Sequence, residues 1–216
     1  MIIHNLENTD SVLNNFISEI RNLNTQKDAM RFRRNIERIG EILSYEMSKV
    51  LHYSFKNVVS PHGVKKIALC QQDLVLCSVL RAGLPLHQGI LNYFDNIENA
   101  FISAYRHHTK GGDFKIVVEY LASPSLEEKV LILADPMLAT GSSLVSVYNS
   151  LIKLGKINQI HLVAVIASAQ GIDYIAKHFP ENTHLWVATI DDKLDEKGYI
   201  IPGLGDAGDL AFGKKL

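Results

Sequence analysis

Hydrophobic residues near the N-terminus of the chain recur at steps of three and four positions. They alternate with charged residues such as Arg31 and Glu37, as an amphipathic helix requires. The apolar positions of this stretch are Ala29, Phe32, Ile36, Ile39, Leu43, Met47 and Val50. We therefore expect residues 1–55 to form a helical N-terminal extension that packs against the rest of the molecule.

The pattern changes after residue 70 to short apolar runs. They span residues 74–80, 100–105, 114–121, 130–134, 160–167 and 185–190. Helical patterns separate several of these runs, which favours an α/β fold with a doubly wound, mainly parallel sheet. We expect one domain over residues 1–216, with its core sheet in residues 70–190 and a C-terminal segment in residues 191–216.

The second and third runs are joined differently from the others. Between them lies a polar stretch, residues 107–113, that contains Gly111 and Gly112 and has no helix-length pattern. This pattern predicts an antiparallel β-hairpin. We expect its tip to be mobile and to act as a lid.

Composition excludes several classes of protein. The 216 residues are 47% hydrophobic and 21% charged, and the formal net charge of -1 gives no overall attraction to nucleic acid or to a membrane. Cys70 and Cys77 do not form a CxxC pair and are expected to be buried free thiols. No apolar run approaches the roughly 18 residues of a membrane span, and residues 1–10 do not resemble a secretory signal, so we expect a cytoplasmic protein.

The most informative motif follows the run at residues 130–134. A loop of small and polar residues begins at Asp135 and leads into a helical pattern that starts at Leu144. The loop consists of Asp135, Pro136, Met137, Leu138, Ala139, Thr140, Gly141, Ser142 and Ser143. Backbone N–H groups at such a strand-to-helix junction converge with the positive end of the helix dipole, which suits a phosphate.

The side chains of this loop refine that prediction. Thr140, Ser142 and Ser143 offer hydroxyl donors, whereas the Asp135 carboxylate can accept hydrogen bonds from ribose hydroxyls. A sugar phosphate is the ligand that this combination indicates. The loop has no lysine, which disfavours a P-loop nucleotide triphosphatase. The simpler alternative is that Asp135 starts a turn and that Ser142 or Ser143 caps the helix.

A second glycine-rich segment spans residues 198–209. Gly203, Gly205 and Gly208 satisfy the Gly-x-Gly-x-x-Gly pattern of dinucleotide-binding proteins. That site needs a following helix and strand, with an acidic residue roughly 20 positions further on. Only eight residues follow Gly208. We instead interpret the glycines as bringing the backbone close to a flat ligand.

Both segments resemble one known family. The string from Asp135 to Ser143 is similar to the motif with which uracil phosphoribosyltransferases bind 5-phosphoribosyl 1-diphosphate (PRPP), including an Asp-Pro pair where most other phosphoribosyltransferases have two acidic residues. Residues 198–209 resemble the uracil-binding stretch of the same family, and the resemblance covers roughly residues 28–213. It implies a phosphoribosyltransferase-like fold and the synthesis of UMP and diphosphate from uracil and PRPP.

The resemblance also implies roles for individual residues. Those expected to bind PRPP are Arg81, Arg106, Asp135, Pro136, Met137, Leu138, Ala139, Thr140, Gly141, Ser142, Ser143 and Asp206. Those expected at uracil, mainly through backbone groups, are Ile200, Gly205, Asp206 and Ala207. Arg106 would stabilise the departing diphosphate, and Asp206 is the candidate general base. Mg²⁺ would be held mainly through PRPP, so no protein metal site is predicted.

The chain departs from the family pattern at three places. His107 and His108 stand where an acidic pair is usual, Ser142 replaces a frequent glycine, and Leu210 stands where a basic residue is common. Adjacent residues of an extended segment point to opposite faces, so we interpret His107 and His108 as solvated lid residues rather than as metal ligands.

Two alternatives to the enzyme remain, together with a prediction on assembly. A uracil-nucleotide sensor that binds RNA would need a basic face, and the candidates are Arg31, Arg33, Arg34 and Arg38, interrupted by Glu37 and Glu41. A non-catalytic relative would bind ligands or partners only. The apolar helix face of the first fifty residues predicts self-association as a homodimer or higher homo-oligomer, as is common in the family.

Overall fold

A computed structural model describes the backbone of residues 1–108 and 114–215, and the side chains of these ranges except those of residues 104–118. The strands are β1 (Ile2–Asn5), β2 (Tyr53–Ser60), β3 (Gly63–Cys70), β4 (Leu74–Leu80), β5 (Glu98–His108), β6 (Phe114–Ala122), β7 (Val130–Ala134), β8 (Met137–Leu138), β9 (Gln159–Ser168), β10 (His184–Asp191), β11 (Lys193–Leu194) and β12 (Ile200–Ile201). The α-helices are α1 (Leu13–Arg21), α2 (Ala29–Ser48), α3 (Leu84–Leu91), α4 (Ser142–Leu151), α5 (Ala169–Ala176) and α6 (Ala207–Phe212), and the 3-10 turns are η1 (Leu6–Asn8) and η2 (Ile152–Leu154).

The core is one sheet with the strand order β1-β10-β9-β7-β4-β5-β6, and the short β8 pairs with β9. All of these pairings are parallel except that of β6, which is antiparallel to β5 at one edge. The predicted doubly wound, mainly parallel sheet is therefore confirmed. β4 and β7 have the bounds that their apolar runs predict.

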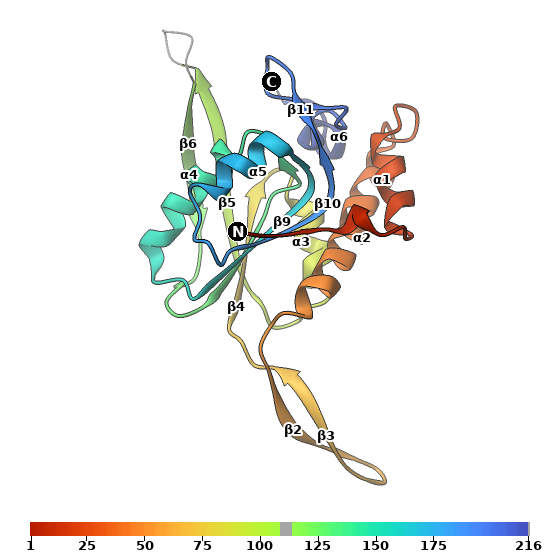
Figure 1. The fold of residues 1–216 in the computed structure, drawn as a ribbon, viewed down its shortest axis with the longest axis vertical. Coiled ribbons are helices and arrows are strands. Elements are labelled where there is room, and N and C mark those ends of the chain that lie inside the picture. The colour runs from red at the N-terminus through yellow and green to blue at the C-terminus, as the bar shows by residue number, and fades with distance from the viewer. Residues whose placement is uncertain (109–113, 216) are drawn as a thin grey trace.

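Helices cover both faces of this sheet (Figure 1). Along β7, Val130, Ile132 and Ala134 pack into the cluster that contains the apolar residues of α1, α2 and α3. The intervening Leu131 and Leu133 pack into the cluster that contains α4 and α5. Because successive side chains of a strand point to opposite faces, a strand that is covered on both faces is apolar throughout.

The helical N-terminal region is confirmed for α1 and α2. Asp28 caps α2, with its side chain accepting a hydrogen bond from the backbone N–H of Arg31. The expectation of helix is wrong for residues 2–5, which form the edge strand β1 beside β10, and for residues 53–55, which belong to β2. In β1 the imidazole of His4 stacks on Trp186 with ring centroids 3.7 Å apart. Four residues are too short to show a helical or strand period.

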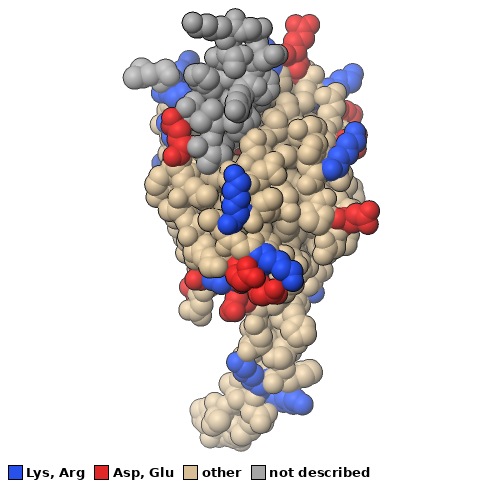
Figure 2. Space-filling view, turned by 90° about the vertical axis from the view of Figure 1, so that its left-hand side faces the viewer, with Lys and Arg blue, Asp and Glu red and all other residues tan. Residues whose placement is uncertain are grey.

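The hairpin formed by β2 and β3 has no counterpart in the sequence-based prediction. We call residues 53–70 the arm, because they project away from the body of the molecule in Figure 1 and at the lower end of Figure 2. The two strands pair in register from Tyr53 opposite Cys70 to Ser60 opposite Gly63. Neither strand belongs to the core sheet, so their side chains lack a buried face that would produce a clear alternation.

The predicted antiparallel hairpin next to the sheet edge is confirmed as β5 and β6. Backbone pairing runs from Phe101 opposite Ala122 to His108 opposite Phe114, with a bulge between Ser103 and Ala104. The tip, residues 109–113, lies outside the described residues, as do the side chains of His107 and His108, so the lid stays a prediction. Among the helices that the structure describes, none has the length and apolar character needed to cross a bilayer.

Candidate active site

The carboxyl ends of the parallel strands gather the candidate residues at one edge of the sheet. Arg81 directly follows β4, Asp135 directly follows β7, and Asp191 is the last residue of β10. Open α/β sheets bind ligands outside the carboxyl ends of their strands. Arg81 and Asp135 directly follow the apolar runs at residues 74–80 and 130–134, and their placement at strand ends is confirmed. The same placement is wrong for Arg106, because β5 continues beyond the run at residues 100–105 to His108.

The loop after β7, residues 135–143, leads directly into α4. Gly141 is the N-cap of this helix and has a left-handed φ of 76°. A Cβ atom at this position would lie 2.8 Å from Cγ2 of Ile175. Ser142 and Ser143 stand in the first turn, and no side chain makes the N-cap hydrogen bond. The alternative that one of these serines caps α4 is therefore wrong. The Ser142 N–H lies 3.4 Å from Oγ1 of Thr140, and the following N–H groups of the first turn point toward the site of a possible ligand.

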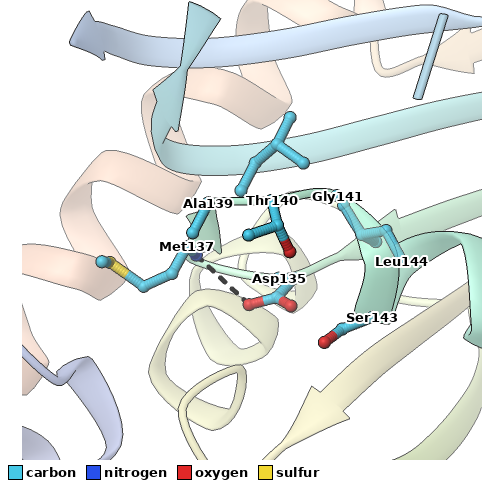
Figure 3. Close-up of a pocket in the computed structure, with 8 residues that line it drawn as sticks. Asp135, Met137, Ala139, Thr140, Gly141, Ser143 and Leu144 are labelled. Atoms are coloured by element: carbon cyan, nitrogen blue, oxygen red, sulfur yellow. Dashed lines mark hydrogen bonds between the residues drawn. The ribbon is translucent and has the colours of Figure 1, made fainter. Parts of the chain in front are cut away.

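Residues of this loop line a small pocket with a volume of about 50 Å³. In Figure 3 the side chains of Asp135, Thr140 and Ser143 point toward a common space, whereas that of Met137 points away from it. Within the loop, Oγ1 of Thr140 lies 2.8 Å from Oγ of Ser142. Pockets that enclose a whole ligand measure about 300–1,000 Å³, so this one is suited to a single group of a larger ligand.

The Asp135 carboxyl group has an altered acidity. Burial raises its pKa from 3.8 to about 6, although the backbone N–H of Met137, 3.2 Å from Oδ1, acts in the opposite direction. The ionised carboxylate is under-solvated, and hydroxyl donors from a ligand would stabilise it. Such a group is suited to accept hydrogen bonds from a sugar.

The helix α5 and its N-cap residue contact the loop of residues 135–143 at Ala139. Ser168, which caps α5, donates a hydrogen bond from Oγ to the carbonyl of Ala139 over 2.7 Å and accepts one from the backbone N–H of Gly171. A Cβ atom on Gly171 would lie only 2.1 Å from the Ala139 carbonyl oxygen. The backbone of α5 therefore touches the loop directly at this glycine.

The glycine-rich segment lies at the same edge of the sheet. β12 pairs antiparallel with β11, and the chain then turns through Gly203 (φ 61°) and Gly205 (φ 94°). Asp206 caps α6 by accepting a hydrogen bond from the backbone N–H of Asp209. Ile200 and Ala207 are buried, which fixes both ends of the turn. The glycines follow β12, a two-residue strand that pairs with β11 outside the parallel core sheet, which argues against a dinucleotide site.

Arg81 reaches from the end of β4 to the C-terminal segment. Its Nη2 donates to the Gly213 carbonyl over 3.1 Å and lies 3.4 Å from Oδ1 of Asp209. Oδ2 of Asp206 lies 3.4 Å from Nζ of Lys215. Arg106 lies within β5, and its side chain belongs to the range that the structure does not describe.

Sequence reasoning missed residues that hold the glycine-rich segment. Arg21, Gln26 and Asp191 form hydrogen bonds with the backbone of Gly203 and Leu204. Two of them lie in the N-terminal region, almost 180 residues away along the chain. Neither forms part of a local motif, so no sequence signal pointed to them.

Comparisons with known proteins agree on one family. A model of the uracil phosphoribosyltransferase family matches residues 8–214. A uracil phosphoribosyltransferase of Porphyromonas gingivalis is 51% identical over 206 residues, which are 95% of this chain and 95% of that protein. The solved structure of a protein from Aquifex aeolicus superimposes with a TM-score of 0.87 at 28% identity and covers 98% of both chains.

A more distant structure supports the fold alone. A hypoxanthine phosphoribosyltransferase from Staphylococcus aureus superimposes with a TM-score of 0.50 at 16% identity, covering 80% of this chain and 85% of that one. The family match extends over nearly the whole chain and includes both segments at the carboxyl edge of the sheet. On these grounds the chain belongs to the uracil phosphoribosyltransferase family.

Proposed function

We propose that this chain transfers the 5-phosphoribosyl group of PRPP to N1 of uracil, which yields UMP and diphosphate. One observation carries the proposal beyond family membership. The loop of residues 135–143 and the segment of residues 200–209 lie at the same carboxyl edge of the sheet. Arg81, at the end of β4, contacts Asp209 of that segment. This arrangement supports a sugar-phosphate site at the loop and a site for a flat base at the glycine-rich turn.

We assign the ribose phosphate of PRPP to the loop. The N–H groups of the first turn of α4 and the hydroxyls of Thr140, Ser142 and Ser143 would bind the 5-phosphate, with the backbone of residues 136–139 and Gly141 shaping the cradle. The Asp135 carboxylate would accept hydrogen bonds from ribose hydroxyls. Arg81 and Arg106 would bind the diphosphate, and Asp206 would face PRPP.

Uracil is assigned to the backbone of the glycine-rich turn. Ile200, Gly205 and Ala207 would present N–H and C=O groups to the two carbonyls and the N3–H of the base, and Asp206 would lie beside it. Cytosine carries an amino group at C4, so it would place a donor against a donor. An unpaired buried donor costs about 1–3 kcal/mol, which is enough for strong selection between the two bases.

The reaction is a displacement at the anomeric carbon of the ribose. The bond from this carbon to the diphosphate oxygen breaks while the bond to uracil N1 forms, and positive charge develops on the sugar ring. Arg106 would stabilise the departing negative charge, and Asp206 is the candidate acceptor for the N1 proton. Alignment and charge stabilisation would supply most of the rate enhancement, and closure of the hairpin tip would exclude water.

Mg²⁺ is the cofactor that we propose. The described residues contain no group of three or more His, Cys, Asp or Glu side chains that could hold a metal ion. Asp135 is a single hard oxygen ligand at the pocket, so the ion would bind mainly through oxygen atoms of PRPP. Bound in this way, Mg²⁺ would neutralise charge on the leaving diphosphate.

We also propose that residues 1–216 act as one domain, with the extension 1–55, the core sheet 70–190 and the uracil-binding segment 191–216. Residues of α2, β7, β10 and α6 belong to the same hydrophobic cluster, which supports a single folding unit. Cys70 and Cys77 are free thiols, which fits a reducing compartment such as the cytoplasm. Cys77 is buried as expected, whereas the expectation is wrong for Cys70, which is partly exposed at the end of the arm.

Self-association would use a surface other than the one the sequence suggested. The apolar face of α2, including Phe32, Ile39 and Leu43, is buried within the chain and is not available to a partner. The arm instead exposes large apolar side chains, among them Phe55 at 68% and Val59 at 81%. We propose that the arm pairs with a second copy of the chain.

The charges of the N-terminal helix argue against an RNA-binding sensor. Arg31 and Arg34 form ion pairs with Glu19 and Glu37, Arg33 donates to the Ala211 carbonyl over 2.7 Å, and Arg38 lies over the ring of Phe16. These four arginines make contacts within the chain, so they do not form the free basic face that a phosphate backbone would require.

The first test is UMP formation from uracil, PRPP and Mg²⁺, with cytosine and hypoxanthine as competing bases. Of the three bases, only uracil should give product. Asp135→Ala should lower kcat/KM at least about 100-fold, the scale of losing one strong polar contact to the transition state. Asp173→Ala, at an exposed position of α5, is the matched control and should match the wild type. Tight uracil binding without product from any base would instead support a sensor.

A further inference from the structure

We propose that Arg21, Asp191 and Gln26 are positioning residues for uracil. They anchor the backbone of Gly203 and Leu204, immediately before the turn that is assigned to the base. The inference rests on the function proposed above, because it concerns how the uracil site is held in place. None of the three side chains needs to touch either substrate.

The central contact is an ion pair between α1 and the end of β10. Nη1 and Nη2 of Arg21 lie 2.9 and 2.8 Å from the two oxygens of Asp191. The pair is sheltered, with 8% of the Asp191 side chain and 21% of the Arg21 side chain exposed. A two-point contact between a guanidinium and a carboxylate fixes the orientation as well as the distance of its partners.

The same ion pair forms hydrogen bonds with both backbone groups of Gly203, its carbonyl and its N–H. Nη1 of Arg21 donates to the Gly203 carbonyl over 3.2 Å, and the Gly203 N–H donates to Oδ2 of Asp191 over 2.9 Å. Gly203 has a φ of 61°, a conformation that glycine reaches without strain but does not hold by itself. The ion pair therefore selects one conformation of a residue that could otherwise adopt many.

Gln26 binds the next residue, Leu204, and we call Arg21, Gln26 and Asp191 together the anchor. Nε2 of Gln26 lies 3.2 Å from the Leu204 carbonyl, and it also donates to the carbonyls of Ile20 and Arg21. The side chain is 8% exposed. This amide group thus joins the end of α1 to the residue that directly precedes Gly205.

The anchor continues to the N-terminal turn η1. Oε2 of Glu7 accepts hydrogen bonds from Oγ1 of Thr189 and from the backbone N–H of Ile190, and Nη2 of Arg21 lies 3.1 Å from the same Thr189 oxygen. In Figure 1, α1 lies beside β10 near the end of the strand that leads toward α6. Two N-terminal elements therefore converge on the base of the glycine-rich turn.

This arrangement explains how a flexible segment could discriminate between bases. Recognition through backbone groups requires placement to within about 0.5 Å, and a displacement of about 1 Å in a positioning group can cost about 100-fold in rate. Gly203 and Gly205 would allow such displacements if nothing restrained them. The anchor acts on uracil without acting on the PRPP loop, which α5 supports separately.

The test compares two independent parts of the anchor. Gln26→Met keeps the length of the side chain and removes its donors. Arg21→Met removes the ion pair, whereas Arg21→Lys keeps the charge and loses the forked geometry. We expect kcat/KM for uracil to fall about 10- to 100-fold in the two methionine variants and less in Arg21→Lys. The Kd for PRPP, measured by calorimetry with Mg²⁺ and without uracil, should change much less than this, because Asp206 is the one residue assigned to PRPP that belongs to the anchored turn.

A second readout does not depend on catalysis. Amide hydrogen exchange of residues 200–208 in the substrate-free protein should be faster in Gln26→Met and Arg21→Met than in the wild type. The control is Asn35→Ala, which removes a 2.7 Å hydrogen bond to Glu19 between α2 and α1 and does not contact the segment. It should lower Tm while both uracil use and the exchange of residues 200–208 match the wild type.

The outcomes separate this inference from the proposed function. A wild-type protein that makes no UMP refutes the proposed function, although the exchange measurement still reports on the anchor. An active wild type whose Gln26→Met variant uses uracil normally, or loses uracil and PRPP affinity in parallel, overturns the inference alone. If Arg21→Met does not fold, Gln26→Met and Arg21→Lys still decide the question.

Discussion

The burial of Asp135 affects both the stability of the fold and the proposed role of this residue in binding. Its carboxyl group lies where the buried strand β7 meets the loop of residues 135–143, and burial raises its pKa to about 6. In the substrate-free protein the ionised form is disfavoured, so the contribution of Asp135 to stability is greatest at low pH and is lost as pH rises through about 6. A ligand hydroxyl would recover part of this loss by solvating the carboxylate.

We therefore predict that Asp135→Asn is more stable than the wild type at pH 8, by about 1–3 kcal/mol. Raising the pKa of this carboxyl group from 3.8 to about 6 corresponds to about 3 kcal/mol, and the partial exposure of Asp135 to solvent reduces that figure. The gain should fall to about half at pH 5, because the unfolded chain still ionises there with the ordinary pKa of 3.8, and it should vanish only below that pH. Urea unfolding at both pH values measures the difference. A variant that is less stable at pH 8 would show that the carboxylate stabilises the fold.

At the scale of elements, α5 and the loop of residues 135–143 form one unit. The close approach of Gly171 to the Ala139 carbonyl leaves no room for a side chain, and the Ser168 hydroxyl links the two backbones. The geometry of the loop therefore depends on a helix that contributes no predicted ligand. A change in α5 should therefore affect the proposed binding of PRPP more than other properties of the protein.

Gly171→Ala is expected to weaken PRPP binding at least about tenfold, because the new methyl group must displace the loop backbone. The strain should also lower the free energy of unfolding by about 1–3 kcal/mol, despite the better helix propensity of alanine. Calorimetry with PRPP and urea unfolding measure the two effects. The exposed neighbour Gln170→Ala serves as the control, and equal PRPP affinity in both variants would contradict the prediction.

At the scale of the whole molecule, the arm lies at the end opposite the β5–β6 hairpin (Figure 1). A two-stranded hairpin is marginally stable by itself, and this one exposes an apolar face with Phe55, Val59 and Val64. It also carries Lys56, Lys65 and Lys66, whereas a hollow next to its base is lined by Asp73, Asp95 and Glu98. These complementary features favour an arrangement in which each arm covers a second copy.

We predict that the wild type sediments as a dimer or larger assembly and that the double variant Phe55→Glu, Val59→Glu shifts it to a monomer. Two charges on the exposed face should oppose burial of that face in an interface. Core packing should persist because the arm lies outside the core sheet. Sedimentation velocity gives the answer, with Tyr174→Glu on α5 as the control. A monomeric wild type would refute the assembly.

Local patterns carried much of the prediction. The apolar runs at β4 and β7 coincide with the observed strands, and the amphipathic repeat located α2, because short-range periodicity controls these elements. The arm and β1 were missed for a related reason: an exposed hairpin and a four-residue edge strand have no buried face whose period the sequence could display. The helix α6 was missed because glycine and aspartate dominate its start.

Within the candidate site, too, the local motif could be predicted and the long-range contacts could not. The Asp135 loop is contiguous, so the sequence by itself determined its strand, its turn, its helix and its family. The anchor of the glycine-rich turn joins Arg21 to Gly203 across 182 positions, and Arg81 to Asp209 across 128. Only the tertiary structure decided these contacts, because they depend on which strand ends and helix ends the sheet brings together, and no short stretch of sequence contains both partners.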